Sequence, residues 1–219
     1  MAEGLAIGGI ARLSTCDWPG ELVATLFTQG CPWACGYCHN PSLIPRTGAC
    51  IAWADVLDFL LGRRGILDGV VVSGGEPTLQ KGLPEALRAI RSMGFRTGLH
   101  TAGPYPERLA RVLPHLDWVG FDVKGPWDSY ERITGVAHSD RSARASLRLL
   151  RESGVAFDLR TTVHPALLSP LDLSAMDAGL IAEGLPPSRR QPCRSAGAAG
   201  HGCGAGSLAV HGMQRIAGN

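Results

Sequence analysis

Apolar and polar positions follow two different periods along this chain. Short apolar runs rich in β-branched residues, bounded by glycine or polar residues, are typical of buried strands. Five such runs are Leu22–Thr28, Asp68–Ser73, Phe95–His100, Asp117–Val123 and Val155–Val163. Between and after them, apolar residues recur with the spacing of one helical face. These helices are predicted over Trp53–Leu60, Leu83–Ile90, Leu109–Leu116, Ala143–Leu150 and Leu173–Ala182.

The alternation of strands and helices predicts an α/β fold with a mainly parallel sheet and right-handed crossovers. Two architectures satisfy this pattern, a doubly wound open sheet and a full or partial β/α barrel. In both, the chemistry is expected in the loops that follow the carboxyl ends of the strands.

The C-terminal part of the chain has a different composition. Residues 184–219 contain eight glycines, three prolines and no acidic residue, and only Ser207–Val210 shows a weak apolar run. We therefore divide the chain into a core domain, residues 1–183, and an atypical, poorly ordered tail, residues 184–219. Pro186–Arg190 makes a poor sixth strand. We hypothesise a shifted reading frame or divergence after about Leu185, with one sheet edge left uncovered.

Composition and charge exclude several classes of protein. Apolar residues make up 45% of the 219 residues, which is enough for a sizeable core and excludes wholesale disorder. The formal charge of +2 argues against a nucleic-acid binder that relies on a broad basic field. We find no apolar run long enough for a membrane span and no signal-peptide pattern, so we expect a cytoplasmic protein.

Three of the seven cysteines are clustered in the loop after the first predicted strand. Cys31, Cys35 and Cys38 form a C-x3-C-x2-C pattern. In a reducing compartment, such clustering indicates a metal site rather than disulfides. Three thiolates can each bind one iron of a [4Fe–4S] cluster, and with no fourth cysteine nearby one iron would stay open for chemistry.

Two alternatives to the cluster remain at this point. Zinc prefers four ligands, which Cys31, Cys35, Cys38 and His39 would supply, although the adjacent Cys38 and His39 can hardly face one tetrahedral centre. The other alternative is three unligated thiols. The remaining cysteines, Cys16, Cys50, Cys193 and Cys203, fit no ligand spacing and are interpreted as ordinary reduced thiols.

Further motifs follow the other predicted strands. Ser73-Gly74-Gly75-Glu76-Pro77 follows the second strand, His100-Thr101-Ala102-Gly103 the third and Asp122-Val123-Lys124 the fourth. Because the carboxyl ends of parallel strands meet at one edge, these motifs and the cysteine loop are expected to form a single site.

Taken together, these motifs resemble those of a known family, the radical S-adenosylmethionine (SAM) enzymes. The cysteine pattern with Tyr37 before its last cysteine is similar to the signature of that superfamily, and Ser73–Pro77 to its second motif. Phe27–Pro41, with Asp17–Gly20, His100–Gly103 and Asp122–Lys124, resembles the activating proteins of glycyl radical enzymes. The likeness is strongest to the activating proteins of anaerobic ribonucleoside-triphosphate reductase and covers roughly residues 5 to 170.

The resemblance implies a partial (β/α)6 TIM-like barrel, here with a degenerate last strand. It implies that the open iron binds the methionine part of SAM and that a reduced cluster passes an electron to the sulfonium. The bond from sulfur to C5′ then breaks, and the resulting 5′-deoxyadenosyl radical removes a hydrogen atom from a glycine of the partner. The implied partners are anaerobic ribonucleotide reductase and a flavodoxin- or ferredoxin-type electron donor.

The resemblance also assigns roles to individual residues, and each has a structural alternative. Gly74 and Gly75 would allow close backbone approach and Glu76 would pair with the SAM ammonium, or these residues form a plain strand-to-helix turn. Asp122 and Lys124 would lie near SAM, with Lys124 part of the catalytic set, or they form only a mutual ion pair.

Four more residues are implied near the cofactor. Thr101 would face the SAM pocket. His100 stands where relatives often carry an acid, so no cation site is expected there, and His100 itself would contact SAM or pack in the core with its hydrogen bonds satisfied. Arg160 would contact the SAM carboxylate, or form a structural salt bridge. Tyr37 would cover the adenine, or pack in the core.

Two other functions remain open on the sequence alone. One is a radical SAM enzyme acting on a small molecule, similar to a 7-carboxy-7-deazaguanine synthase. The other is a non-catalytic metal-binding module.

Overall fold

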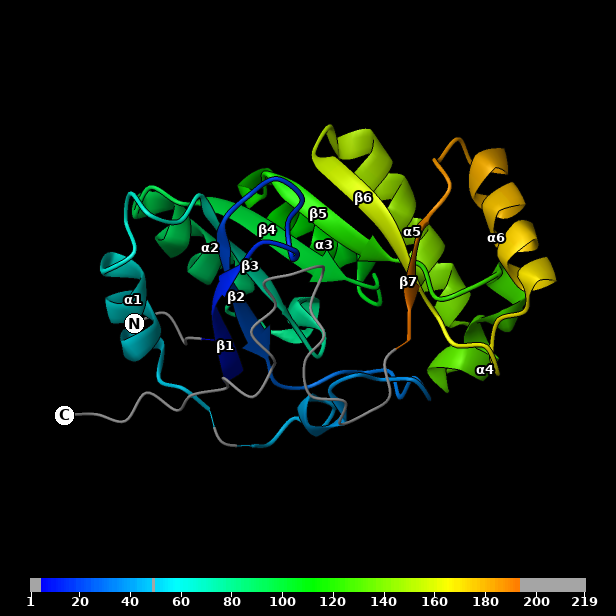
Figure 1. Ribbon diagram of the computed structural model, residues 1–219, viewed down its shortest axis with the longest axis horizontal. Coiled ribbons are helices and arrows are strands. Elements are labelled where there is room, and N and C mark those ends of the chain that lie inside the picture. Colours follow the sequence, from blue (N-terminus) through cyan, green and yellow to red (C-terminus); the bar gives the residue numbers. More distant parts are fainter. Residues whose placement is uncertain (1–4, 49, 194–219) are drawn as a thin grey trace.

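The computed structural model describes residues 5–48 and 50–193, and its centre is one seven-stranded sheet (Figure 1). The strands lie side by side in chain order: β1 (Ile7–Ser14), β2 (Val23–Thr28), β3 (Gly69–Gly74), β4 (Arg96–Thr101), β5 (Trp118–Asp122), β6 (Ala156–Val163) and β7 (Arg189–Pro192). β1 pairs antiparallel with β2, and every later pair is parallel. β1 and β7 are not paired, so the sheet is an open, partial barrel.

Helices connect the parallel strands. They are α1 (Trp53–Leu61), α2 (Leu83–Ser92), α3 (Pro106–Val112), α4 (Tyr130–Thr134), α5 (Ser139–Ser153) and α6 (Pro170–Ala182). Within the described residues, four single turns of 3-10 helix lie at Pro41–Leu43, Pro77–Leu79, Leu113–His115 and Trp127–Ser129. Because each parallel strand neighbours the next in sequence, right-handed crossovers place the connecting helices on one side of the sheet (Figure 1). The partial barrel expected from the sequence is confirmed.

The main core lies between the helices and the outer face of the sheet. Alternate strand residues such as Leu26, Val72 and Leu99 are fully buried there against helix residues such as Leu60 and Leu87. The strands show the period of two that a sheet requires, so the intervening residues face the inside of the barrel.

An aromatic stack fills the inner face near the amino ends of the strands. Trp18, from the loop between β1 and β2, stacks on Trp118 of β5 with 5.4 Å between ring centroids. The lack of a side chain at Gly98 makes room for it, because a Cβ there would lie 2.9 Å from the Trp18 ring. The stack closes this end of the barrel and leaves the polar inner residues toward the carboxyl edge.

Three elements differ from the sequence prediction. β1 was not predicted, because its Ile-Gly-Gly-Ile segment interrupts the alternation. α3 begins at Pro106 and ends at Val112, after which Leu113–His115 tightens into a 3-10 turn around Pro114, so the predicted continuous helix to Leu116 is wrong. α4 was also not predicted, since five residues are too few to show a period.

The poor sixth strand predicted at Pro186–Arg190 is present as a short strand with different bounds. Arg189–Pro192 forms β7, whose register pairs Arg160 with Arg189 and Val163 with Pro192. Proline is tolerated there because β7 is an edge strand. The edge of β6 is therefore covered from Arg160 to Val163, and the expectation of an uncovered edge is wrong for this part of the strand. The rest of the predicted tail, including Ser207–Val210 and Cys203, lies outside the described residues, and the division at residue 183 stays a prediction.

No helix among the described residues is long and apolar enough to cross a membrane.

Candidate active site

The cysteine loop follows β2 and is held in place by its backbone. Gly30, at φ 98°, turns the chain out of the strand, and its N–H donates to the Leu43 carbonyl at 2.8 Å. The N–H of Cys31 donates to Ile44 at 3.0 Å, and that of Ala34 to Thr134, at the end of α4, at 2.9 Å. The loop is thus anchored on both sides before any metal binds.

The thiols of this loop lie in apolar surroundings. Cys31 and Cys35 are partly buried against Trp33 and Tyr130. Burial raises the pKa of the Cys31 thiol to about 11 and also raises the pKa of Cys35. Since only the thiolate binds metal, these thiols need a cationic partner of the kind that iron supplies. The donor set fits a cluster with three cysteine ligands.

The arrangement fits zinc less well. In the described part of the chain, no group of three or more His, Cys, Asp or Glu side chains is placed to hold a single metal ion. Ligands of one zinc ion must all lie within about 2.3 Å of one point, whereas the thiolates of a [4Fe–4S] cluster bind different irons. The zinc set of Cys31, Cys35, Cys38 and His39 is therefore not assembled.

Glu76 lies next to this loop and is almost fully buried, at 2% exposed. It follows β3 and begins the 3-10 turn Pro77–Leu79, where its side chain accepts from the Thr78 N–H. Its backbone N–H donates to the Gly30 carbonyl at 2.9 Å, and its carboxylate is close enough to Cys31 to raise the pKa of that thiol. The backbone of Glu76 thus forms the strand-to-helix turn that the sequence left as one interpretation, and its carboxylate lies near the Cys31 thiol.

Gly74 and Gly75 allow the strand ends to approach closely. A Cβ at Gly74, which has φ 107°, would meet the Thr28 backbone, and one at Gly75 would meet the Gly30 carbonyl. The expected close approach of backbone is present, and in this structure it joins the loop after β3 to the loop after β2.

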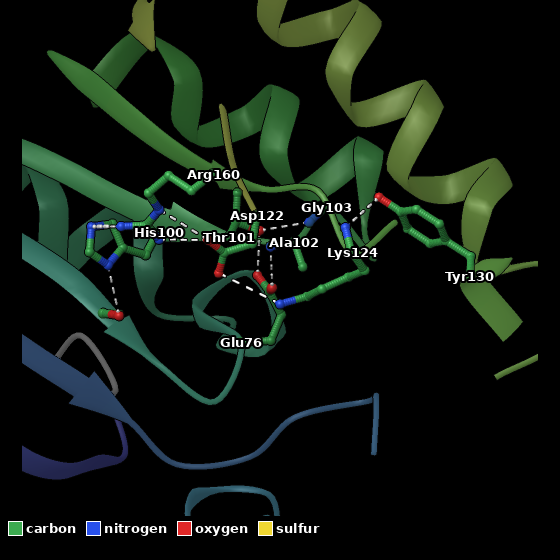
Figure 2. Close-up of polar contacts among 10 residues, drawn as sticks. Glu76, His100, Thr101, Ala102, Gly103, Asp122, Lys124, Tyr130 and Arg160 are labelled. Carbon is green, nitrogen blue, oxygen red and sulfur yellow. Dashed lines mark hydrogen bonds and ion pairs between the residues drawn. The ribbon is translucent and has the colours of Figure 1, made fainter. Parts of the chain in front are cut away.

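The Glu76 carboxylate accepts four hydrogen bonds, of which those from Thr101 and Ala102 are drawn in Figure 2. Its Oε1 accepts from the Thr78 N–H at 3.1 Å, the Thr78 hydroxyl at 2.6 Å and the Thr101 hydroxyl at 2.7 Å. Its Oε2 accepts from the Ala102 N–H at 3.1 Å. Burial raises the pKa of Glu76, and these bonds oppose the rise.

A second polar group crosses the inner face of the sheet (Figure 2). Arg160 of β6 donates from Nε and Nη2 to Asp122 Oδ1 of β5, at 3.0 and 2.8 Å. Its Nη1 lies 2.9 Å from Nε2 of His100, on β4. Arg160 thus forms the salt bridge that the sequence left as one of two interpretations, and its contact with a ligand carboxylate stays a prediction.

His100 is buried as a neutral imidazole. Burial and the Arg160 cation lower its pKa to about 4. Its Nδ1 lies 3.1 Å from the Ser73 hydroxyl and its Nε2 lies 2.7 Å from the Asp17 carbonyl. The Asp17 carbonyl can only accept a hydrogen bond and the Arg160 guanidinium can only donate one. Nε2 of His100 therefore either donates to Asp17, when it carries the proton, or accepts from Arg160, when it does not.

Asp122 and Lys124 face each other beside the cysteine loop. Lys124 Nζ lies 3.7 Å from Asp122 Oδ2 and 5.8 Å from the centre of the Tyr37 ring. Burial alone would raise the pKa of Asp122, but Arg160 and Lys124 outweigh it and bring that pKa to about 2. Burial alone would lower the pKa of Lys124, but the Tyr37 phenol and the Asp122 carboxylate hold it well above its ordinary range. The pair is charged and belongs to a larger network.

Tyr37 closes the group on the side of the cysteine loop. It packs with Ile133 and Leu168, and its hydroxyl has no hydrogen-bond partner in the part of the chain that the structure describes. The core role is therefore present, the Lys124 ammonium lies over the ring, and the contact with adenine stays a prediction.

The structure thus brings the predicted residues to one edge of the sheet and adds some that the sequence did not single out. Thr78 and the Ala102 N–H hold Glu76, and Tyr130 accepts from the Lys124 N–H at 3.2 Å. Of these, only Thr78 could have been found from the sequence. An acidic residue at the start of a turn often accepts a hydrogen bond from the N–H two positions later, which here belongs to Thr78.

Comparison with known proteins agrees with this geometry. The sequence model of the radical SAM superfamily matches residues 25–168. A Methanocaldococcus jannaschii protein named as a glycyl-radical enzyme activating enzyme is 29% identical over 177 residues, which are 76% of this chain and 72% of that protein. The pyruvate formate-lyase-activating enzyme of Clostridium pasteurianum is 32% identical over 168 residues, 74% of this chain and 69% of the enzyme.

Solved structures share the fold. Streptococcus suis SuiB matches 78% of this chain with a TM-score of 0.60 and 16% identity, and anSMEcpe with bound AdoMet matches 76% with a TM-score of 0.59 and 20% identity. The matched part is 39% of the SuiB chain and 49% of the anSMEcpe chain. At these identities the likeness shows the fold alone.

Proposed function

Because the chain belongs to the radical SAM superfamily and, within it, to the activating enzymes of glycyl radical enzymes, we propose that it forms a glycyl radical on anaerobic ribonucleoside-triphosphate reductase. Members of this superfamily are enzymes that use a [4Fe–4S] cluster and SAM, which argues against the non-catalytic metal-binding module. When bound, the cluster and SAM supply a 5′-deoxyadenosyl radical by reductive cleavage, with methionine as the other product.

The chain's own residues hold and enclose these groups. Cys31, Cys35 and Cys38 would hold three irons of the cluster, and Trp33 and Tyr130 would give Cys31 and Cys35 an apolar wall. Glu76 accepts a hydrogen bond from the SAM ammonium, while Gly74 and Gly75 keep the neighbouring backbone close.

The other predicted residues complete the cofactor pocket. Lys124 and Asp122 present a fixed pair of charges to SAM, and Arg160 holds Asp122 ionised. Tyr37 offers its ring to the adenine. Thr101 belongs to the same pocket through its contact with Glu76.

One observation carries the proposal: the carboxylate of Glu76 lies beside the cysteine loop. The backbone N–H of Glu76 donates to the carbonyl of Gly30, the residue directly before Cys31. A buried acid close to the Cys31 thiol would put an ammonium-binding group beside the open iron of a cluster held by this loop. This is the geometry needed for a ligand that chelates that iron through an amino acid group.

The partners are part of the proposal. An anaerobic ribonucleotide reductase receives the radical, and a flavodoxin- or ferredoxin-type protein supplies the electron. Cysteine thiolates and a reduced cluster suit a reducing compartment, so we place the reaction in the cytoplasm. The relatives named above favour pyruvate formate-lyase as a second candidate partner.

Release of 5′-deoxyadenosine tests the cofactor chemistry. The protein is reconstituted anaerobically with iron and sulfide, reduced and given SAM, and the product is separated by chromatography. We expect release by the wild type and by Cys50→Ala, whose cysteine is exposed and outside the cluster loop, and none by Cys35→Ala. Stable iron binding without release in the presence of the partner contradicts the proposal.

Electron paramagnetic resonance distinguishes the partners. The reduced enzyme and SAM are mixed in turn with anaerobic ribonucleotide reductase and with pyruvate formate-lyase, and the glycyl radical doublet is quantified. A doublet on the reductase supports the proposed target. A doublet only on the lyase, or consumption of a small molecule with no protein radical, overturns it.

A further inference from the structure

The two oxygens of the Glu76 carboxylate are not equivalent. Oε1 accepts three hydrogen bonds, from the N–H and hydroxyl of Thr78 and from the hydroxyl of Thr101. Oε2 accepts one, from the Ala102 N–H. A carboxylate offers about four acceptor positions, two on each oxygen, so only Oε2 keeps a position for another donor.

The direction of the Thr101 hydrogen bond is fixed by its neighbours. Its Oγ1 accepts from the Gly103 N–H at 3.0 Å, and its single hydroxyl hydrogen is donated to Glu76. Thr101 is 2% exposed, so it has no solvent alternative. Its hydroxyl therefore has no hydrogen left for a bound ligand.

Thr78 donates to the same oxygen, Oε1 of Glu76. It is 1% exposed and lies two residues after Glu76, at the start of a 3-10 turn. Its N–H and hydroxyl both reach Oε1, so the turn geometry directs the carboxylate of Glu76 toward β4.

From this asymmetry we infer that Thr78 and Thr101 are positioning residues, which saturate Oε1 of Glu76 and leave Oε2 as the oxygen that receives the ammonium group of SAM. Neither hydroxyl touches the ligand. The inference rests on the proposed function, because it concerns how the same site recognises SAM, and it gives Thr101 a role through Glu76 rather than in direct contact.

Valine and serine substitutions separate positioning from packing. Thr78→Val and Thr101→Val remove the hydroxyl and keep the shape, whereas Thr78→Ser and Thr101→Ser keep the hydroxyl. Thr97→Val is the matched control: Thr97 is also buried on β4, and its hydroxyl donates to the His115 carbonyl at the opposite end of the strand. Iron content and melting temperature are measured for every variant.

The readout is equilibrium binding of SAM to the reconstituted enzyme, compared with an analogue that lacks the α-amino group. Losing a hydrogen bond to a charged group should weaken SAM binding about tenfold in each valine variant, with affinity restored by serine. Binding of the analogue should change less than about twofold, because it has no ammonium for Oε2 to receive. Thr97→Val should bind both ligands as the wild type does.

Other results identify which statement fails. Equal weakening for SAM and the analogue, or equal loss in Thr97→Val, overturns the positioning role while leaving the proposed function in place. Unchanged SAM affinity in both valine variants does the same. A wild type that holds a [4Fe–4S] cluster but does not bind SAM overturns the proposed function itself, and the inference with it.

Discussion

The position that a Cβ at Gly75 would take is filled by the carbonyl oxygen of Gly30, so the backbones of the loop carrying Glu76 and the loop carrying the cysteines are in direct contact. The N–H of Glu76 donates to the same carbonyl, at 2.9 Å. A side chain at residue 75 would separate the acid from the thiols.

We expect Gly75→Ala to reduce both stability and iron retention. Overpacking of a close contact costs about 2 kcal/mol, or a fall of about 6 °C in Tm. Gly62→Ala is the control, since the nearest atom to its Cβ would be an ordinary contact at 3.7 Å. Calorimetry and iron analysis after reconstitution give the two quantities. Equal iron retention in the two variants would show that the contact does not position the cysteine loop.

The effects of replacing Asp122 and Arg160 on the free energy of unfolding should be strongly coupled, because the two side chains form an ion pair. Arg160 is 9% exposed at its side chain and Asp122 34%, so removing one partner leaves the other poorly solvated. We expect Asp122→Asn to lower the free energy of unfolding by about 2 kcal/mol, less than for a fully buried pair. The double variant with Arg160→Met should lose less than the two single losses combined.

An exposed ion pair provides the comparison. Glu85 and Arg88 lie on α2 with side chains 44% and 56% exposed. Glu85→Gln should change the free energy of unfolding by less than about 0.5 kcal/mol. Urea unfolding of all these variants measures the coupling energy, and an additive cycle for Asp122 and Arg160 contradicts the assigned network.

His100 should make the protein acid-sensitive. Its pKa is lowered from 6.5 to about 4, so below pH 6.5 the unfolded chain binds a proton that the folded chain does not. The contribution of His100 to the free energy of unfolding is fully present above pH 6.5. It decreases by roughly 3 kcal/mol in total as the pH falls to 4.

The comparison with His100→Gln isolates this effect from other titrating groups. The difference in unfolding free energy between wild type and variant should be largest at pH 7 and should shrink steadily to pH 4. Denaturant unfolding at four pH values in this range measures it. A difference that does not vary with pH would mean that the pKa of His100 is the same in the folded and the unfolded chain.

The Trp18–Trp118 stack should stabilise the closed end of the barrel. Trp18 is 3% exposed, stacks on Trp118 and lies under the guanidinium of Arg96 at 4.7 Å. We expect Trp18→Ala to cost about 3–5 kcal/mol, because the cavity cannot close around Gly98. Leu171→Ala, at an 82% exposed leucine, should cost less than about 0.5 kcal/mol. Thermal unfolding of both variants checks the contrast.

The strands β2 to β6 of the parallel sheet could be predicted because each lies in a short segment rich in apolar and β-branched residues. The predicted Val155–Val163 and Phe95–His100 differ from β6 and β4 by one residue at one or both ends. β7 could not be predicted, since Arg189 and Arg190 are exposed and its strand conformation comes from pairing with β6. The strand propensities of the four residues of β7 alone do not predict a strand.

The site was predictable as a set of motifs and not as a set of contacts. The cysteine spacing and the glycine pair before Glu76 mark their loops directly in the sequence. The bond from Thr101 to Glu76 spans 25 positions, and the one from Arg160 to His100 spans 60. Such pairings depend on strand register, which a single sequence does not reveal.

The polar group on the inner face joins four neighbouring strands through Ser73, His100, Arg160 and Asp122, one residue from each. A replacement at any of these positions leaves a buried charge or hydrogen-bonding atom on the next strand without its match. We therefore expect these positions to change together among relatives. Where a relative carries an acid in place of His100, we expect its counterparts of Ser73 and Arg160 to differ as well.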